Sequence, residues 1–109
     1  MCECNGAVLA SLREYFAEKG QNVALYDDFD AFLSSGIEAV VLANYANEHA
    51  PFAVRCLESG LHVLSEVLPV ATLREAVLLA DAVQTSGKIY RYAENYCFSR
   101  AAREMTRLY

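Results

Sequence analysis

The sequence has 109 residues, of which 55% are hydrophobic and 21% charged, with a formal net charge of −5 at pH 7. This length fits one domain with a buried core, and no apolar run approaches the roughly 20 residues of a membrane-spanning helix. Nine Lys and Arg residues face 14 Asp and Glu residues, so nucleic acid is not expected as a partner.

The cysteines and the N-terminus both indicate a cytoplasmic protein. Cys2, Cys4, Cys56 and Cys97 follow neither a disulfide framework nor the paired Cys-x-x-Cys spacing of a zinc site. No basic segment followed by an apolar one marks a signal peptide. We therefore expect reduced thiols, no metal ligands and a cytoplasmic location.

Amphipathic spacing predicts five helices, and short apolar runs between them predict four strands. The second helix has Asp27 or Asp28 as its cap, and Thr72 and Glu75 form a capping box at the start of the fourth. The predicted helices are 7–19, 28–35, one that begins between Asn47 and Pro51, one that follows Thr72, and one from about Ser99; the predicted strands lie near 22–26, 38–43, 61–65 and 88–93.

A glycine separates each predicted helix from the strand that follows it, at Gly20, Gly36, Gly60 and Gly87. Glycine adopts the left-handed conformation that often ends a helix. Helix, glycine and strand, repeated four times, predict an α/β fold with a mostly parallel sheet of about four strands and helices on both faces. The run 39–43 is apolar at every position, which predicts a central strand covered on both faces.

Polar residues follow the predicted strands. In a parallel sheet the carboxyl ends of the strands meet at one edge, where ligands of such folds bind. A polar small molecule fits this pattern better than a protein surface does. The residues are Tyr26 and Asp27, the loop 44–49, Ser65 and Glu66, and the segment 94–96.

Three blocks of sequence resemble the nucleotide-binding domain of the Gfo/Idh/MocA oxidoreductases. Residues 38–49 resemble the family's fourth strand and its Thr-Pro-Asn-x-x-His loop, and 62–66 resemble its His-Val-Leu-Cys-Glu-Lys-Pro motif. Residues 87–98 resemble the sixth strand and the Asn-Tyr-x-Phe segment after it. The resemblance implies a partial, doubly wound Rossmann-like domain over residues 1–109, with NAD (or NADP) as cofactor and sugars or polyols as substrates.

The same resemblance implies which residues would bind the cofactor. An acidic residue at the end of the second strand binds the adenosine ribose, and a carboxylate there favours NAD because it repels a 2′-phosphate. His49 either contacts the cofactor or orients its loop through a hydrogen bond. The implied cofactor residues are Glu3, Ala43, Asn44, Tyr45, His49, Glu66 and Asn95, and no catalytic residue or metal ligand is expected.

The sequence also departs from the family's pattern. It has no Gly-x-Gly-x-x-Gly, Val67 stands where the family has lysine, and the proline has moved to Pro69. The family's first strand and phosphate loop would precede Met1, and its substrate domain would follow Tyr109. We therefore expect part of a Rossmann domain that is catalytically inert by itself and binds nucleotide weakly or not at all.

Two further expectations concern assembly. In the family's strand order 3-2-1-4-5-6, loss of strands 1 and 2 leaves residues 40–42 with an unpaired apolar edge. Such an edge recruits other strands, which predicts a homo-oligomer, most simply a dimer. The alternative is a non-enzymatic α/β interaction module that reuses the fold for dimerisation.

Overall fold

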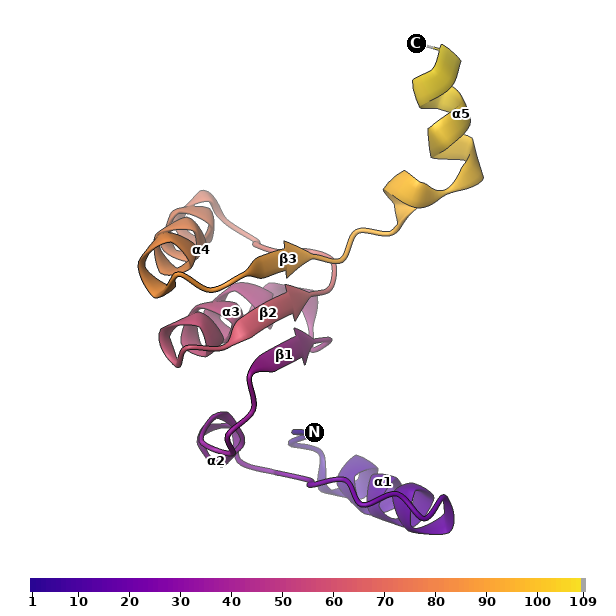
Figure 1. Cartoon of the computed structure of the whole chain (residues 1–109), viewed down its shortest axis with the longest axis vertical. Coiled ribbons are helices and arrows are strands. Elements are labelled where there is room, and N and C mark those ends of the chain that lie inside the picture. The colour runs from indigo at the N-terminus through magenta and orange to yellow at the C-terminus, as the bar shows by residue number, and fades with distance from the viewer. Residues whose placement is uncertain (109) are drawn as a thin grey trace. The chain divides into compact units, whose positions relative to one another are not determined.

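The computed structural model describes residues 1–108, and Tyr109, the last residue of the expected domain, lies outside them. The chain divides into two compact units, residues 1–37 and the residues from 38 onward, so each unit is described by itself. Figure 1 shows the order of the elements along the chain. Among the described residues, no helix combines the length and apolar character needed to span a membrane.

The first unit contains two helices, α1 (Gly6–Glu18) and α2 (Phe29–Leu33). The Asn5 side chain accepts hydrogen bonds from the first turn of α1, and Asp28 rather than Asp27 caps α2, accepting from Ala31 N at 2.7 Å. Gly20, after α1, has a φ of 63°, the left-handed conformation expected there. Both predicted helices are therefore confirmed.

The strand predicted at 22–26 is wrong. Only Tyr26 pairs, in an isolated parallel bridge with Cys2. Glu3 N donates to Tyr26 O at 3.0 Å, and Tyr26 N donates to Met1 O at 2.9 Å. This bridge joins the two ends of the segment 1–26, which contains α1. The residues 22–26 are mostly apolar, but they do not form a strand because only one of them pairs with another segment.

The second unit contains a parallel sheet of three strands, β1 (Ala39–Leu42), β2 (His62–Ser65) and β3 (Tyr90–Tyr92), in the order β1-β2-β3. These strands confirm the predictions near 38–43, 61–65 and 88–93, and the α/β, partial Rossmann-like fold. The described sheet has three strands where about four were expected.

Helices α3 (His49–Glu58) and α4 (Leu73–Ser86) pack against each other, and α3 packs against β1 and β2. The capping box predicted at Thr72 and Glu75 opens α4. Alternate strand residues face this layer, so Val40, Leu42 and Val63 are buried. Helix residues complete the core: Ala53, Cys56, Leu57, Leu79 and Ala82.

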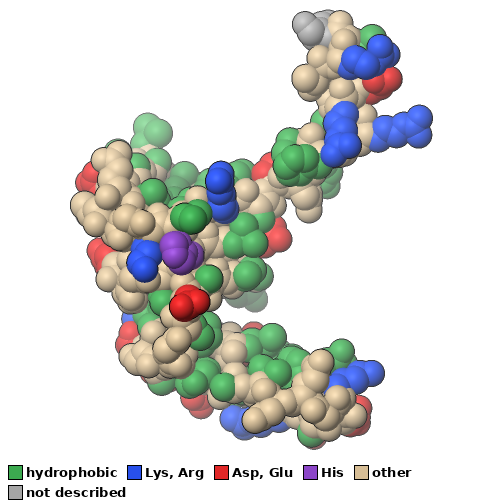
Figure 2. Space-filling model, viewed as in Figure 1, with side chains coloured by type: hydrophobic (Ala, Val, Ile, Leu, Met, Phe, Trp, Pro, Cys, Tyr) green, Lys and Arg blue, Asp and Glu red, His purple; other side chains and the backbone are tan. Residues whose placement is uncertain are grey.

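The other face of this sheet is open. Val41 is 68% exposed, and Leu64 and Ile89 are exposed too, so the expectation that β1 is covered on both faces is wrong for this unit. Within residues 38–108, the helix that packs against β1 and β2 is α3. In the space-filling view, hydrophobic side chains lie uncovered over the strands (Figure 2).

Two single-turn 3-10 helices come after strands in the chain: η1 (Ala46–Glu48) after β1 and η2 (Tyr96–Phe98) after β3. The last helix, α5 (Arg100–Leu108), begins after Ser99, whose hydroxyl accepts a hydrogen bond from Ala102 N at 3.2 Å. Met105 and Leu108 of this helix are exposed. Helix α5 contacts η2.

Candidate functional site

The carboxyl ends of the three strands form one edge, because all of them run in the same direction. The backbone ladder extends one residue past the strands: Glu66 N donates to Leu42 O at 3.0 Å, and Ala93 N donates to Ser65 O at 2.8 Å. Ala43, Glu66 and Ala93 are therefore neighbours at this edge. Polar residues follow each of the three strands within two positions, as the sequence predicted: Asn44 after β1, Glu66 after β2 and Glu94 after β3.

Asn44 carries an unused acceptor. Its amide nitrogen approaches Glu48 Oε2 at 3.5 Å, a weak contact. Its side-chain oxygen Oδ1 is buried, and no described residue donates a hydrogen bond to it. A buried acceptor without a donor is costly, so this atom is suited to accept a hydrogen bond from a ligand. Tyr45, next in the chain, is 78% exposed and free to contact a ligand.

His49 is buried, with 1% of its surface exposed, and connects two loops of the edge. Its Nε2 lies 3.0 Å from Asn44 O, in the loop after β1, and its Nδ1 lies 2.8 Å from Leu68 O, in the loop after β2. A neutral ring donates to one of these carbonyls, and a protonated ring donates to both. Both nitrogens face carbonyl oxygens of these loops, so His49 acts on the edge through the two loops that it connects.

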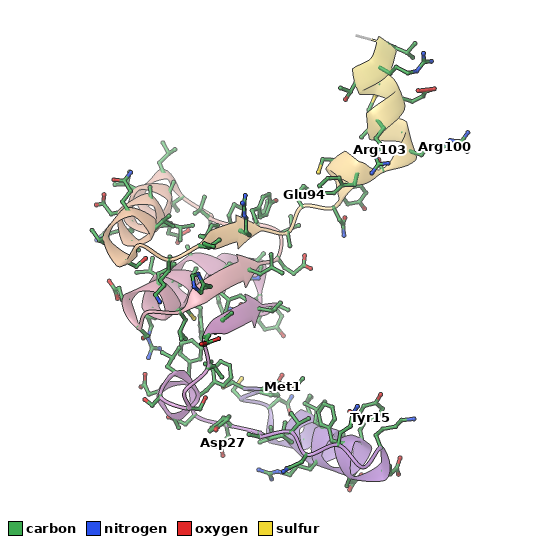
Figure 3. All side chains as sticks on the ribbon, in the orientation of Figure 1. Met1, Tyr15, Asp27, Glu94, Arg100 and Arg103 are labelled. Carbon is green, nitrogen blue, oxygen red and sulfur yellow. The ribbon has the colours of Figure 1, made fainter. Side chains whose placement is uncertain are left out.

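Glu66 and Glu94 place two carboxylates at the edge. Glu66 is exposed and Glu94 half-buried, and Glu94 Oε1 accepts a hydrogen bond from Tyr96 N at 2.6 Å. Figure 3 labels Glu94 on the segment between β3 and η2. Asn95, which follows it, is exposed and makes no capping hydrogen bond to η2.

Tyr92, the last residue of β3, lies within electrostatic reach of both Glu66 and Glu94. Loss of hydration, the charge of Glu94, a hydrogen bond to that carboxylate and the charge of Glu66 all raise the pKa of the Tyr92 phenol. An adjacent negative charge disfavours the phenolate, which explains the direction. The edge is therefore negative around Tyr92.

A second tyrosine of β3, Tyr90, has a buried hydroxyl to which no described residue hydrogen-bonds. Burial raises the pKa of this phenol, and the nearby Ser65 hydroxyl partly offsets the effect. Ser65 itself donates to Glu66 O at 3.3 Å. Tyr90 pairs with Val63 and so points into the helix-covered side of the sheet.

Glu3 belongs to the other unit. It is half-buried, and its Oε1 accepts a hydrogen bond from Asn5 N at 2.8 Å, just before α1. The structure thus brings most of the predicted residues to one edge of the sheet, and Glu3 to the end of the Cys2–Tyr26 bridge. Ala43 and Glu66 lie at the sheet edge, Asn44 and Tyr45 follow Ala43 in its loop, and His49 contacts the backbone of that loop; Asn95 lies three residues past β3, directly before η2.

Sequence reasoning missed Tyr92 and the carbonyl of Leu68. Tyr92 was an ordinary strand residue in the sequence, although its position two residues before Glu94 puts a phenol near a carboxylate at a strand end. The bond between His49 and Leu68 joins residues 19 positions apart and has no local signal. Within residues 1–108, no group of three or more His, Cys, Asp and Glu side chains could hold a metal ion.

Comparison with solved structures supports the Rossmann architecture. The WlbA dehydrogenase from Bordetella pertussis, in complex with NADH and UDP-GlcNAcA, matches with a TM-score of 0.76 and 20% identity over 89% of this chain. A probable dehydrogenase from Thermotoga maritima matches with a TM-score of 0.79 and 18% identity over 97% of this chain. An NAD-binding protein from Listeria innocua matches with a TM-score of 0.67 and 28% identity over 81% of this chain.

The chain spans 27%, 31% and 25% of the lengths of these three proteins, respectively. Comparison with curated proteins gave no match. The model of the oxidoreductase family with an NAD-binding Rossmann fold matches residues 8–94, which is most of the sequence. The chain therefore belongs to the Gfo/Idh/MocA oxidoreductase family, through its NAD-binding Rossmann domain.

Proposed function

We propose that this chain binds a nicotinamide dinucleotide across the carboxyl edge of its sheet. The observation that carries the proposal is the buried, unpaired Oδ1 of Asn44 at this edge. Ribose hydroxyls and the nicotinamide carboxamide both offer donors for such an acceptor. The chain belongs to an NAD-binding family, which supports the same ligand. The place of Asn44 also supports it, because ligands of α/β sheets bind at the carboxyl ends of the strands.

In the first unit, the residue that we propose as a cofactor ligand is Glu3, which lies beside the Cys2–Tyr26 bridge; an acidic side chain binds the adenosine ribose in Rossmann folds. In the second unit, the residues that we propose as contacts of the nicotinamide half are Asn44, Tyr45, Glu66 and Asn95. A carboxylate at Glu3 favours NAD over NADP, because a 2′-phosphate would meet a like charge.

The activity of a whole protein that contains this domain would be oxidation of a sugar or polyol hydroxyl, or reduction of the corresponding carbonyl. When bound, the nicotinamide supplies the hydride chemistry, and the residues of this chain hold and orient it. The chain has no Gly-x-Gly-x-x-Gly phosphate loop, and Val67 replaces the family's lysine. For these reasons we propose that residues 1–109 bind dinucleotide weakly and do not turn over substrate by themselves.

Calorimetric titration with NAD⁺ tests the binding proposal. Asn44→Leu keeps the size of the side chain but removes the acceptor, and we expect the affinity to fall roughly tenfold, as for loss of a buried hydrogen bond. Asn47→Leu, an exposed change in η1 of the same loop, should leave the affinity unchanged. Absence of any binding at millimolar NAD⁺ would overturn the proposal, and equal losses in both variants would overturn the role of Asn44.

A second proposal is self-association through the edge strand β1. Its outer edge has no partner strand in the described sheet, and Val41 lies exposed on the open face. This face forms a shallow groove of about 400 Å³ that includes Leu64 and Ile89. Light scattering should detect dimers in the unmodified chain and monomers in Val41→Lys. The control Val77→Lys, an exposed apolar position on α4, should still dimerise.

We also propose the cytoplasm as the location of the protein. Cys2, Cys4, Cys56 and Cys97 are all free, as a reducing compartment would keep them. Mass spectrometry of the protein alkylated in cell lysate should find the exposed Cys4 and Cys97 as thiols.

A further inference from the structure

The open face of the sheet presents apolar side chains to solvent within residues 38–108. Val41, Leu64 and Ile89 are exposed there and line the groove of about 400 Å³. Arg91, which is exposed, and His62, which is half-buried, line the same groove. A contiguous apolar surface rimmed by polar residues is typical of a contact with another protein segment.

Helix α5 has an apolar side that its own unit does not bury. One side of the helix has three apolar residues at helical spacing, and the opposite side has three arginines. They are Ala101, Met105 and Leu108 on the one side, and Arg100, Arg103 and Arg107 on the other. No residue of α5 is buried, and the element against which it packs is η2. A helix of nine residues is marginal in water by itself, so α5 needs a partner for its apolar side.

The length and the charges of α5 match the open face. The nine residues of α5 span about 13 Å, and a strand of four residues spans about the same length. Glu66 lies two residues past Leu64, so it continues the open side of β2. Each charge of the open face thus has an opposite charge on α5: Arg91 can pair with Glu104, and Glu66 with an arginine. Within the helix, Glu104 accepts a hydrogen bond from Arg107 at 2.8 Å.

The connection between β3 and α5 is fixed by its own hydrogen bonds. Glu94 Oε1 accepts from Tyr96 N at 2.6 Å, and Cys97 Sγ donates to Glu94 O at 3.2 Å. Ser99 N donates to Tyr96 O at 3.0 Å, and the Ser99 hydroxyl accepts from Ala102 N. With this connection in place, α5 packs on η2 and its residues remain unburied. A cover for the open face that leaves these bonds intact is therefore the α5 of a second copy.

We propose that α5 of one copy packs its apolar side on the open sheet face of a second copy, and that the second copy returns the same contact. The inference rests on the proposed self-association and adds the segment that makes it. With three arginines and one glutamate, α5 carries a charge of +2, which leaves −7 for the rest of a chain whose total is −5. Opposite charges of this kind favour the encounter of two copies.

Reciprocal exchange also supplies the area that a stable dimer needs. A stable complex buries about 1,600 Å² in total, and the contact of one nine-residue helix is smaller. When each copy gives its α5 and receives the other, the contact occurs twice and closes about a two-fold axis. Exchange of an identical element between protomers is a low-cost route to a dimer.

Light scattering over a range of protein concentrations tests the role of α5. Met105→Lys puts a charge on the apolar side and should raise the dissociation constant of the dimer about a hundredfold, because each dimer contains the contact twice. Thr106→Lys, an exposed change away from the apolar side of the same helix, is the matched control and should leave the constant unchanged. Circular dichroism verifies that both variants are folded.

Photo-crosslinking distinguishes exchange between copies from closure within one chain. Benzoylphenylalanine in place of Met105 is activated in an equal mixture of isotope-labelled and unlabelled chains. Mass spectrometry should find crosslinks to the peptides that contain Val41, Leu64 or Ile89, and these crosslinks should join labelled to unlabelled peptides.

The possible outcomes separate this inference from the proposed self-association. If the unmodified chain is monomeric at millimolar concentration, the proposed self-association is wrong and the inference falls with it. If Met105→Lys dimerises as tightly as the unmodified chain, self-association through β1 stands and the inference is overturned. Crosslinks that join only peptides of the same label would also overturn it, because α5 would then cover the sheet of its own chain.

Discussion

Replacement of His49 by alanine should destabilise the unit of residues 38–108 by about 3–4 kcal/mol. The ring is buried, and it contacts the carbonyl oxygens of Asn44 and Leu68 at 3.0 and 2.8 Å. Loss of the hydrogen bonding costs about 1–2 kcal/mol, and the cavity left by the ring adds roughly 2 kcal/mol. This is a large part of the few kcal/mol that stabilise a unit of such a size.

The stability of this unit can be measured on its own through one backbone amide. Val63 N donates to Ile89 O at 2.8 Å in the middle of the sheet, so the hydrogen exchange of this amide reports the opening of β2 and β3. His49→Gln, whose amide group can donate to one carbonyl, should lose about half as much stability as His49→Ala.

His62→Ala is the matched control for this experiment. His62 lies in β2, is half-buried, and its Nδ1 accepts one hydrogen bond from Ile89 N at 3.0 Å. Its loss should cost about 1 kcal/mol. If His49→Ala costs no more than His62→Ala, the reasoning that His49 fastens two loops is refuted.

Three smaller effects follow from other features of the chain. Burial raises the pKa of the Cys56 thiol from 9.0 to about 11, so its contribution to stability is fully present below pH 9 and lost as the pH rises toward 11; urea unfolding of Cys56→Ala should lack this part of the pH dependence. Thr72→Ala removes the hydroxyl that caps α4 and should cost about 1 kcal/mol, seen as a lower Tm. Gly87→Ala has free space around the new methyl group but a φ of 64°, so thermal unfolding should show a loss of about 1 kcal/mol from backbone strain alone. An unchanged Tm in either of the last two variants would contradict the corresponding reasoning.

The helices and strands were predicted well where they depend on residues close together in the sequence, such as helix caps and short apolar segments. The side chains of Asn5, Asp28 and Thr72 satisfy the free amides of a helix start, and the three helices begin directly after them. The short, mostly apolar segments after Gly36 and Gly60 form parallel strands, because a helix connects each strand to the next one.

The expectations that failed depended on distant contacts. The segment 22–26 is apolar enough for a strand, yet a strand needs a ladder along its length, and Cys2 supplies only one bridge. The run 39–43 is apolar on both sides, but periodicity does not say whether a second layer is present, and Val41 remains exposed. Sequence patterns thus give the preference of a segment, and the neighbours decide whether it is fulfilled.

The candidate site was predictable as a set of strand ends, but its contacts were not. Parallel topology is enough to bring Asn44 and Glu66 to one edge. The bond of His49 to Leu68 depends on the path of the loop after β2, which no motif encodes. The roles of Tyr92 and of the unpaired Asn44 oxygen appear only when burial and neighbouring charges are known.

The parallel order of the sheet also determines when it can form during synthesis. Ala39 pairs with His62 and Val63 with Tyr90, so a complete helix separates every pair of adjacent strands. The ribosome must therefore release α3 before β2 can join β1, and α4 before β3 can join β2. The spatial order of the strands is thus the order in which they leave the ribosome and can be added to the sheet.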